Sequence, residues 1–191
     1  IDRSRGLGDV YKRQAVAGVL VAAVSAAAFR MVGPIYGAQV GLEVEQIAYF
    51  LSAYVFGGAL AQYPIGWFAD KYDRRWVLIW LSVAAIVSSM LSTSISYNNT
   101  LGIFLIAFGF GFTTFPIYSV AAAHAHDFAS LDERVELSAS LLFYYAIGAI
   151  AAPLFASFLM DSFGPNAMFV LIAFAHLLLV IFGVARMRVR P

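Results

Sequence analysis

The sequence predicts an all-α membrane protein with six transmembrane helices. Of its 191 residues, 62% are apolar and only 12% are charged, and the mean hydropathy is +0.82. A soluble domain typically carries about 25% charged residues. Six apolar stretches approach or exceed the roughly 20 residues that a helix needs to cross the hydrocarbon of a bilayer. The solvent of this chain is therefore predicted to be lipid.

The six predicted spans alternate with short polar turns. Residues 1–14 differ in composition from the rest and are predicted to be a non-native or linker-like leader, outside the bundle of residues 15–191. A basic leader before an apolar run also suits a signal peptide, but five further apolar spans disfavour that interpretation. Turn residues are expected after the third span, at 97–99, and after the fifth, at 161–166. The predicted spans are 15–36, 46–69, 76–96, 101–123, 137–160 and 167–185.

Small residues at four-residue spacing predict where helices meet. Hydrophobicity does not distinguish a helix from lipid, so close packing in a membrane relies on residues with little or no side chain. Two rows have this spacing. They are Gly33, Gly37 and Gly41 at the end of the first span, and Gly148, Ala152 and Ala156 on the fifth.

The basic residues predict which end of the bundle faces the cytoplasm, because short cytoplasmic loops carry an excess of Lys and Arg. With six alternating spans, eleven basic residues fall on one side and none on the other. Both termini are therefore expected in the cytoplasm, with the chain in the plasma (inner) membrane. The opposite side carries only Glu43, Glu45 and Asp161. The eleven basic residues are Arg3, Arg5, Lys12, Arg13, Lys71, Arg74, Arg75, Arg134, Arg186, Arg188 and Arg190.

The composition also disfavours several classes of protein. There is no Cys, so the chain can form no disulfide and no thiolate metal site. The net charge is +1 and the bases flank helices without forming a continuous basic face, which gives no case for a nucleic-acid partner. The motifs G-x-S-G, G-x-G-D and H-E-x-x-H are absent, so an intramembrane enzyme is disfavoured. No cofactor is expected.

The densest charge cluster is the stretch Gly66-Trp67-Phe68-Ala69-Asp70-Lys71-Tyr72-Asp73-Arg74-Arg75, between the second and third spans. Its pattern, G-x-x-x-D-[KR]-x-[GD]-R-R between two membrane helices, resembles the cytoplasmic loop signature of the major facilitator superfamily. The resemblance covers residues 15–191 and is to the carboxy-terminal half of a twelve-helix transporter. A second stretch, residues 114–127 followed by Ser138-Ala139-Ser140, resembles the YcaD-like branch of this family.

The resemblance implies a half built from two inverted three-helix repeats, here about 15–98 and 99–191. It also implies secondary active transport of a small solute by alternating access. The implied partners are this solute, coupled protons, the lipid bilayer and the missing amino-terminal six-helix half. No acid lies deep in a span, so a proton carrier would belong to that missing half. A stand-alone six-span channel or a homodimeric carrier is the alternative function.

The resemblance assigns a gating role to the loop. Asp70 would stabilise the outward-facing state through Arg74 and through the positive end of a helix in the other half. Asp73 stands where many family members have Gly, a position that favours positive backbone angles. The alternative is a solvated loop whose bases only set topology. The implied gating residues are Gly66, Asp70, Lys71, Arg74 and Arg75.

Arg30 is the only base placed inside a span, and such bases usually face a cavity or a partner acid. We expect it to bind an anionic group of the solute or to pair with an acid from the missing half. It could instead extend to the outer surface near Glu43 or Glu45. Other polar groups on the helices that line the cavity in the family could also contact a solute, or could be ordinary packing residues. They are Gln62, Tyr63, Thr113, Thr114, Tyr118, Tyr144 and Tyr145.

Histidines provide two further hypotheses. His176 lies near the centre of the sixth span, where imidazole could take part in proton coupling or simply form a hydrogen bond within the bundle. His124, His126 and Asp127 are the only cluster of metal-type ligands. Positions two apart on a helix point in different directions, so we expect no metal there.

Overall fold

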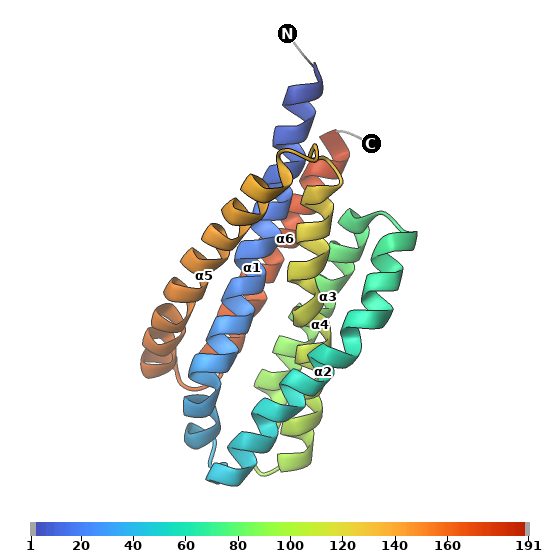
Figure 1. The fold of residues 1–191 in the computed structure, drawn as a ribbon. Coiled ribbons are helices and arrows are strands. Elements are labelled where there is room, and N and C mark those ends of the chain that lie inside the picture. The colour runs from blue at the N-terminus through green and yellow to red at the C-terminus, as the bar shows by residue number, and fades with distance from the viewer. Residues whose placement is uncertain (1–2, 190–191) are drawn as a thin grey trace.

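The computed structural model describes residues 3–189, with side chains described for residues 13–187. Over this range the chain forms six helices and no strand (Figure 1). Each helix is long and apolar enough to cross a membrane. The helices are α1 (Arg3–Gln39), α2 (Val44–Lys71), α3 (Arg74–Ser94), α4 (Thr100–His126), α5 (Arg134–Phe163) and α6 (Ala167–Val189).

Every predicted span is a helix, which confirms the all-α membrane fold, although most helices extend beyond their apolar stretch. Capping residues explain where they begin. The Asn99 side chain accepts a hydrogen bond from the backbone of Gly102 at 2.9 Å, which starts α4. Helix α5 continues through Phe163, so the turn expected over 161–166 is shorter than predicted and starts at Gly164, where φ is +89°.

The turns gather at two opposite ends of the bundle. Both ends of the chain lie together with the α2–α3 and α4–α5 connections, while the other three turns lie at the far end (Figure 1). This is the arrangement that six alternating spans require. Arg190, and the side chains of Arg3, Arg5, Lys12 and Arg188, fall outside the described residues. The motif residues Arg74 and Arg75 lie at the end with the termini.

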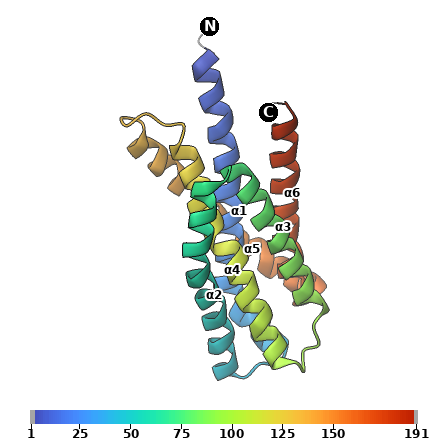
Figure 2. The same ribbon diagram turned by 90° about the vertical axis from the view of Figure 1, so that its right-hand side faces the viewer.

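The helices pack in pairs that are consistent with two inverted repeats. The most extensive interfaces join α2 with α4 and α1 with α5, and α3 runs beside α6 (Figure 2). In an inverted repeat α1, α2 and α3 correspond to α4, α5 and α6. Under this correspondence the α2–α4 interface becomes the α5–α1 interface, and the α3–α6 interface becomes itself. The two halves of the chain therefore use equivalent helices for equivalent contacts.

An aromatic cluster fills the core between four helices. Phe29 of α1 stacks on Tyr54 of α2 with ring centroids 4.1 Å apart, and on Phe110 of α4 at 5.2 Å. Phe169 of α6 meets Phe110 edge to face at 5.9 Å. All four side chains are buried. Edge-to-face and stacked rings of this kind add to the energy of burying their area.

Glycines allow α2 and α4 to touch backbone to backbone. A Cβ atom on Gly57 would overlap the Phe108 carbonyl, and one on Gly111 would overlap the Tyr54 carbonyl. Both overlaps are with main chain, which cannot rotate away. The α2–α4 crossing therefore depends on two glycines, whereas the small-residue rows identified in the sequence lie on α1 and α5.

The predicted small-residue rows also lie at helix contacts, with one exception. Gly148 faces Ala23 and the backbone of Leu20 on α1, and Ala152 and Ala156 on the same face of α5 are buried. Gly33 and Gly37 pack against α2. Gly41 lies past the end of α1 with φ +86°, so it serves the turn and not a helix contact.

The α2–α4 crossing gives a direct test. Gly111→Ala is expected to lower the thermal midpoint of the detergent-purified protein, because overpacking costs roughly 1–3 kcal/mol. Gly109→Ala is the matched control on the same helix, since a Cβ there meets nothing within 4 Å among the described residues. Helix propensity alone favours Ala by about 0.5–1 kcal/mol, so Gly109→Ala should be neutral or stabilising. Equal midpoints for the two variants would contradict the crossing.

Candidate functional site

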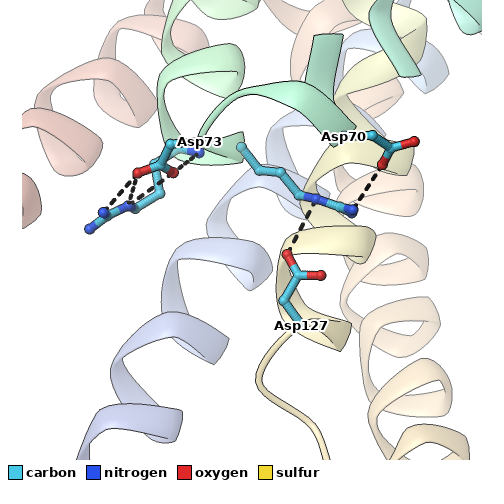
Figure 3. A network of polar contacts seen from close by, with 5 residues as sticks. Asp70, Asp73 and Asp127 are labelled. Atoms are coloured by element: carbon cyan, nitrogen blue, oxygen red, sulfur yellow. Dashed lines mark hydrogen bonds and ion pairs between the residues drawn. The ribbon is translucent and has the colours of Figure 1, made fainter. Parts of the chain in front are cut away.

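The charged turn between α2 and α3 binds a third helix. Arg74 Nη2 donates to Asp70 Oδ1 at 3.0 Å, and Arg74 Nε lies 3.2 Å from Asp127 Oδ2 (Figure 3). Asp70 belongs to the last turn of α2, Arg74 begins α3, and Asp127 caps the end of α4. The Arg74 side chain is only 21% exposed, so its two ion pairs are partly shielded from water. Arg74 therefore ties three helices together at one end of the bundle.

Asp73 forms a second ion pair and caps a helix. Its carboxylate accepts from Arg75 Nη2 at 2.8 Å and from the Arg75 backbone N–H at 2.9 Å. Burial raises the pKa of Asp73, but hydrogen bonds from the Arg75 side chain and backbone outweigh it, so the pKa is lowered overall. The backbone at Asp73 has φ −58°, so this position does not need a glycine. The carboxylate instead supplies the N-cap of α3.

The other two motif residues face away from this network. A Cβ atom on Gly66 would meet nothing within 4 Å among the described residues, which leaves room for another helix to approach. Lys71 Nζ lies 4.6 Å from the centre of the Trp67 ring, a cation–π contact.

Asp127 is a site residue that the sequence analysis missed, because we grouped it with the histidines and not with the motif. In the structure the three side chains have different neighbours. Asp127 pairs with Arg74, the buried His124 ring meets Phe128 edge to face at 5.4 Å, and His126 Nε2 lies 3.2 Å from Ser138 Oγ. An acid directly after an apolar span, on the same side as the basic motif, is the signal that would have found it.

A cavity of about 300 Å³ lies between α1, α4 and α5. It brings together four of the eight predicted solute contacts, namely Arg30, Thr114, Tyr118 and Tyr145. Its other lining residues are Ala22, Ala26, Phe115 and Leu142.

Arg30 reaches across this cavity to α4. Its Cζ lies 5.0 Å from the centre of the Phe115 ring, which is the geometry of a cation–π contact. Within the described part of the chain it has no carboxylate within 4 Å, and neither Glu43 nor Glu45 pairs with it. Tyr118 and Tyr145 meet edge to face at 5.3 Å within the same lining.

The other predicted contacts lie elsewhere and remain predictions. Gln62 accepts a hydrogen bond from Ser119 at 3.1 Å, and Tyr63 is 84% exposed on α2. Thr113 lines a separate groove beside α2 and α3, and Tyr144 lines one near Arg13.

His176 is fully buried between α6 and α1, away from the cavity. Its Nε2 lies 2.9 Å from Ser25 Oγ, whose own proton goes to the Val21 carbonyl at 3.0 Å. With the hydroxyl proton on the carbonyl, Ser25 Oγ accepts from the imidazole in the tautomer that carries its hydrogen on Nε2. Nδ1 has no hydrogen-bond partner among the described residues. The side chain thus links two helices by a hydrogen bond, which fits the second of our two hypotheses for it.

Six membrane-length helices, a cavity between three of them and a charged loop at one end are together the features of a multi-pass membrane protein. The family model of the Major Facilitator Superfamily matches residues 15–191, and the chain belongs to this superfamily.

Curated relatives support this assignment. A transporter of this type from Yersinia pestis, described as uncharacterized, is 29% identical over 151 residues, which are 78% of this chain and 38% of the relative. The transporter YcaD of Escherichia fergusonii is 27% identical over 175 residues, and that of Shigella flexneri is 28% identical over 172; each match covers 88% of this chain and 44% of the relative. The chain therefore spans less than half the length of these relatives.

The Ser25–His176 bond can be tested by stability. Ser25→Ala should destabilise the protein by roughly 1–3 kcal/mol if the imidazole N–H is left unsatisfied, and by as little as about 0.6 kcal/mol if membrane hydrogen bonds set the scale. Ser89→Ala is the matched control, because the buried Ser89 hydroxyl has no hydrogen-bond partner among the described residues. If thermal melts in detergent gave Ser89→Ala a lower midpoint than Ser25→Ala, the contribution of the Ser25–His176 bond to stability would be refuted.

Proposed function

We propose that this chain is the carboxy-terminal six-helix half of a secondary active transporter that moves a small solute by alternating access. The observation that carries the proposal is the Arg74 bridge, which joins α2, α3 and α4 at the end where the motif lies. The length supports it, since the chain spans 38% to 44% of its relatives. Basic residues in the first part of α1 and at the end of α6 match the pattern of the carboxy-terminal half of the family.

The bridge suits a gate between two halves. One Asp70 oxygen binds Arg74, while the side chain stays 75% exposed and can meet the positive end of a helix in the other half. Such an attraction is worth roughly 0.3–1 kcal/mol when exposed. It holds the halves together at the motif end, and the cavity then opens toward the other end. Separating the halves there breaks this contact and reverses the access.

The proposed orientation places the motif and both termini in the cytoplasm. The described basic side chains at this end include those of the motif, while Glu43, Glu45 and Asp161 lie at the other. This asymmetry is the pattern that sets topology. The alternative of a stand-alone channel or homodimeric carrier has no observation in its favour, because the relatives are more than twice as long.

The gate predicts a change in access that can be followed without knowing the solute. The protein is expressed from its full reading frame with any cysteine elsewhere replaced, and Ala26→Cys marks the cavity. Asp70→Asn should shift labelling by an impermeant maleimide from the periplasmic to the cytoplasmic side and reduce transport. Membrane insertion should be unchanged. Asp161→Asn, the same change at the opposite end, is the control. Identical labelling of the Ala26→Cys protein alone, with Asp70→Asn and with Asp161→Asn would rule out the gate.

The orientation predicts the sidedness of single cysteines. Because this chain contains no Cys, Ser130→Cys in the α4–α5 connection and Asn98→Cys in the α3–α4 turn report without background. Impermeant reagent added to intact cells should label Asn98→Cys and spare Ser130→Cys until the membrane is opened. Labelling of both from outside would show that the proposed topology is wrong.

A further inference from the structure

We propose that the cavity between α1, α4 and α5 binds an organic anion, with a carboxylate held by Arg30 and a short apolar or aromatic body against the remaining walls. This inference rests on the proposed function, because it assigns a chemical class to the solute of the same transporter.

The first argument is the uncompensated charge of Arg30. A base inside a membrane span costs roughly 2.5–3.5 kcal/mol even on the lenient insertion scale, so it needs a partner or a wet cavity. Within the described residues no carboxylate lies within 4 Å of it. The acids nearest in sequence, Glu43 and Glu45, begin the next helix, while the guanidinium lies over Phe115, in the middle of α4. The charge is thus placed in the cavity and left for a ligand.

The second argument is that the polar groups around the cavity are donors. Arg30 Cζ lies over the Phe115 ring, and within the described residues the guanidinium has no carboxylate partner, so its N–H groups remain able to hold a carboxylate by two parallel bonds. Tyr118 and Tyr145 add two phenol hydroxyls that form no hydrogen bond within the described residues. Thr114 donates its own proton to the Phe110 carbonyl at 2.8 Å. Among the residues that the structure describes, the lining contains no acid. It therefore favours a ligand group that accepts hydrogen bonds and disfavours a cationic ligand.

The third argument is the apolar remainder of the lining. Ala22, Ala26 and Leu142, with the exposed part of the Phe115 ring, offer no hydrogen bond to a ligand. A volume of about 300 Å³ is at the lower end of the range for small-molecule sites. A solute that fits both parts has one anionic end and a compact apolar body.

The cation–π platform is held in place by α2. Gly58 has no side chain, and a Cβ atom there would overlap the Phe115 ring. The buried Tyr54 ring also packs edge to face against the Phe115 ring, with centroids 5.1 Å apart. Arg30 therefore stacks on a ring that cannot easily turn, which lowers the cost of ordering it around an anion.

The test measures binding of radiolabelled benzoate to the detergent-purified protein made from its full reading frame. Unlabelled cyclohexanecarboxylate, benzamide and benzylamine compete as the aliphatic acid, the neutral isostere and the cation. We expect saturable benzoate binding that cyclohexanecarboxylate displaces and that benzamide and benzylamine displace at least about ten-fold less well.

The variants identify the contacts. Arg30→Gln should weaken benzoate binding by roughly ten- to a hundred-fold, as expected for a hydrogen bond to a charged group, with Arg30→Lys in between. Tyr118→Phe should weaken it by roughly two- to ten-fold. Arg13→Gln removes the same charge near the start of α1, and Tyr49→Phe removes a phenol hydroxyl away from the cavity; both should bind benzoate as the unaltered protein does.

Three results would overturn the proposal. They are no saturable binding of either carboxylate, unchanged benzoate binding by Arg30→Gln, and preferential binding of benzylamine. If Arg30→Gln also lowers the thermal midpoint and neither carboxylate binds, Arg30 pairs with an acid of the other half. Uptake into proteoliposomes separates the two proposals. Carboxylate binding without uptake would contradict the transport proposal and support the anion site. Uptake that is unchanged in Arg30→Gln would support transport and contradict the anion site.

Discussion

Close approach of helix backbones is the constraint on which the rest of this structure depends. In lipid every backbone polar group must be satisfied within its own helix, so the helices are held together by side-chain packing and by how near their axes can come. Gly57 and Gly111 allow α2 and α4 to touch main chain to main chain, and Gly148 brings α5 close to the Ala23 side chain and the Leu20 carbonyl of α1. These two interfaces join corresponding helices of the two halves of the chain, which is consistent with an inverted repeat.

The aromatic core and the cavity are consequences of this packing. Where α2 and α4 meet closely, Tyr54 and Phe110 fill the space toward α1, and Phe29 completes the stack. Five residues further along α4, Phe115 is pressed against Gly58 and lies under Arg30 Cζ. The apolar packing of the bundle therefore also positions the ring that Arg30 contacts. Helix packing and the proposed anion site therefore share residues.

The charged end works differently, through short-range ion pairs in a partly wet environment. Arg74 joins the α2–α3 turn to the end of α4, so movement of either helix changes the same pair of contacts. Sequence reasoning identified Asp70 and Arg74 because they are four residues apart within one motif. It missed Asp127, which lies more than fifty residues away along the chain, because no local pattern links it to Arg74. For the same reason it could propose eight solute contacts but could not tell that four of them share one cavity.

The sequence alone determined the number of spans, the helical class, the family and the charge asymmetry between the two ends. These depend on composition, on the length of apolar runs and on a contiguous motif, all of which are local properties of the chain. Only the tertiary structure decided that Asp127 is the second partner of Arg74 and that Arg30 meets Phe115. Those contacts depend on which helices cross and at what depth, and that is set by packing between residues far apart in the chain.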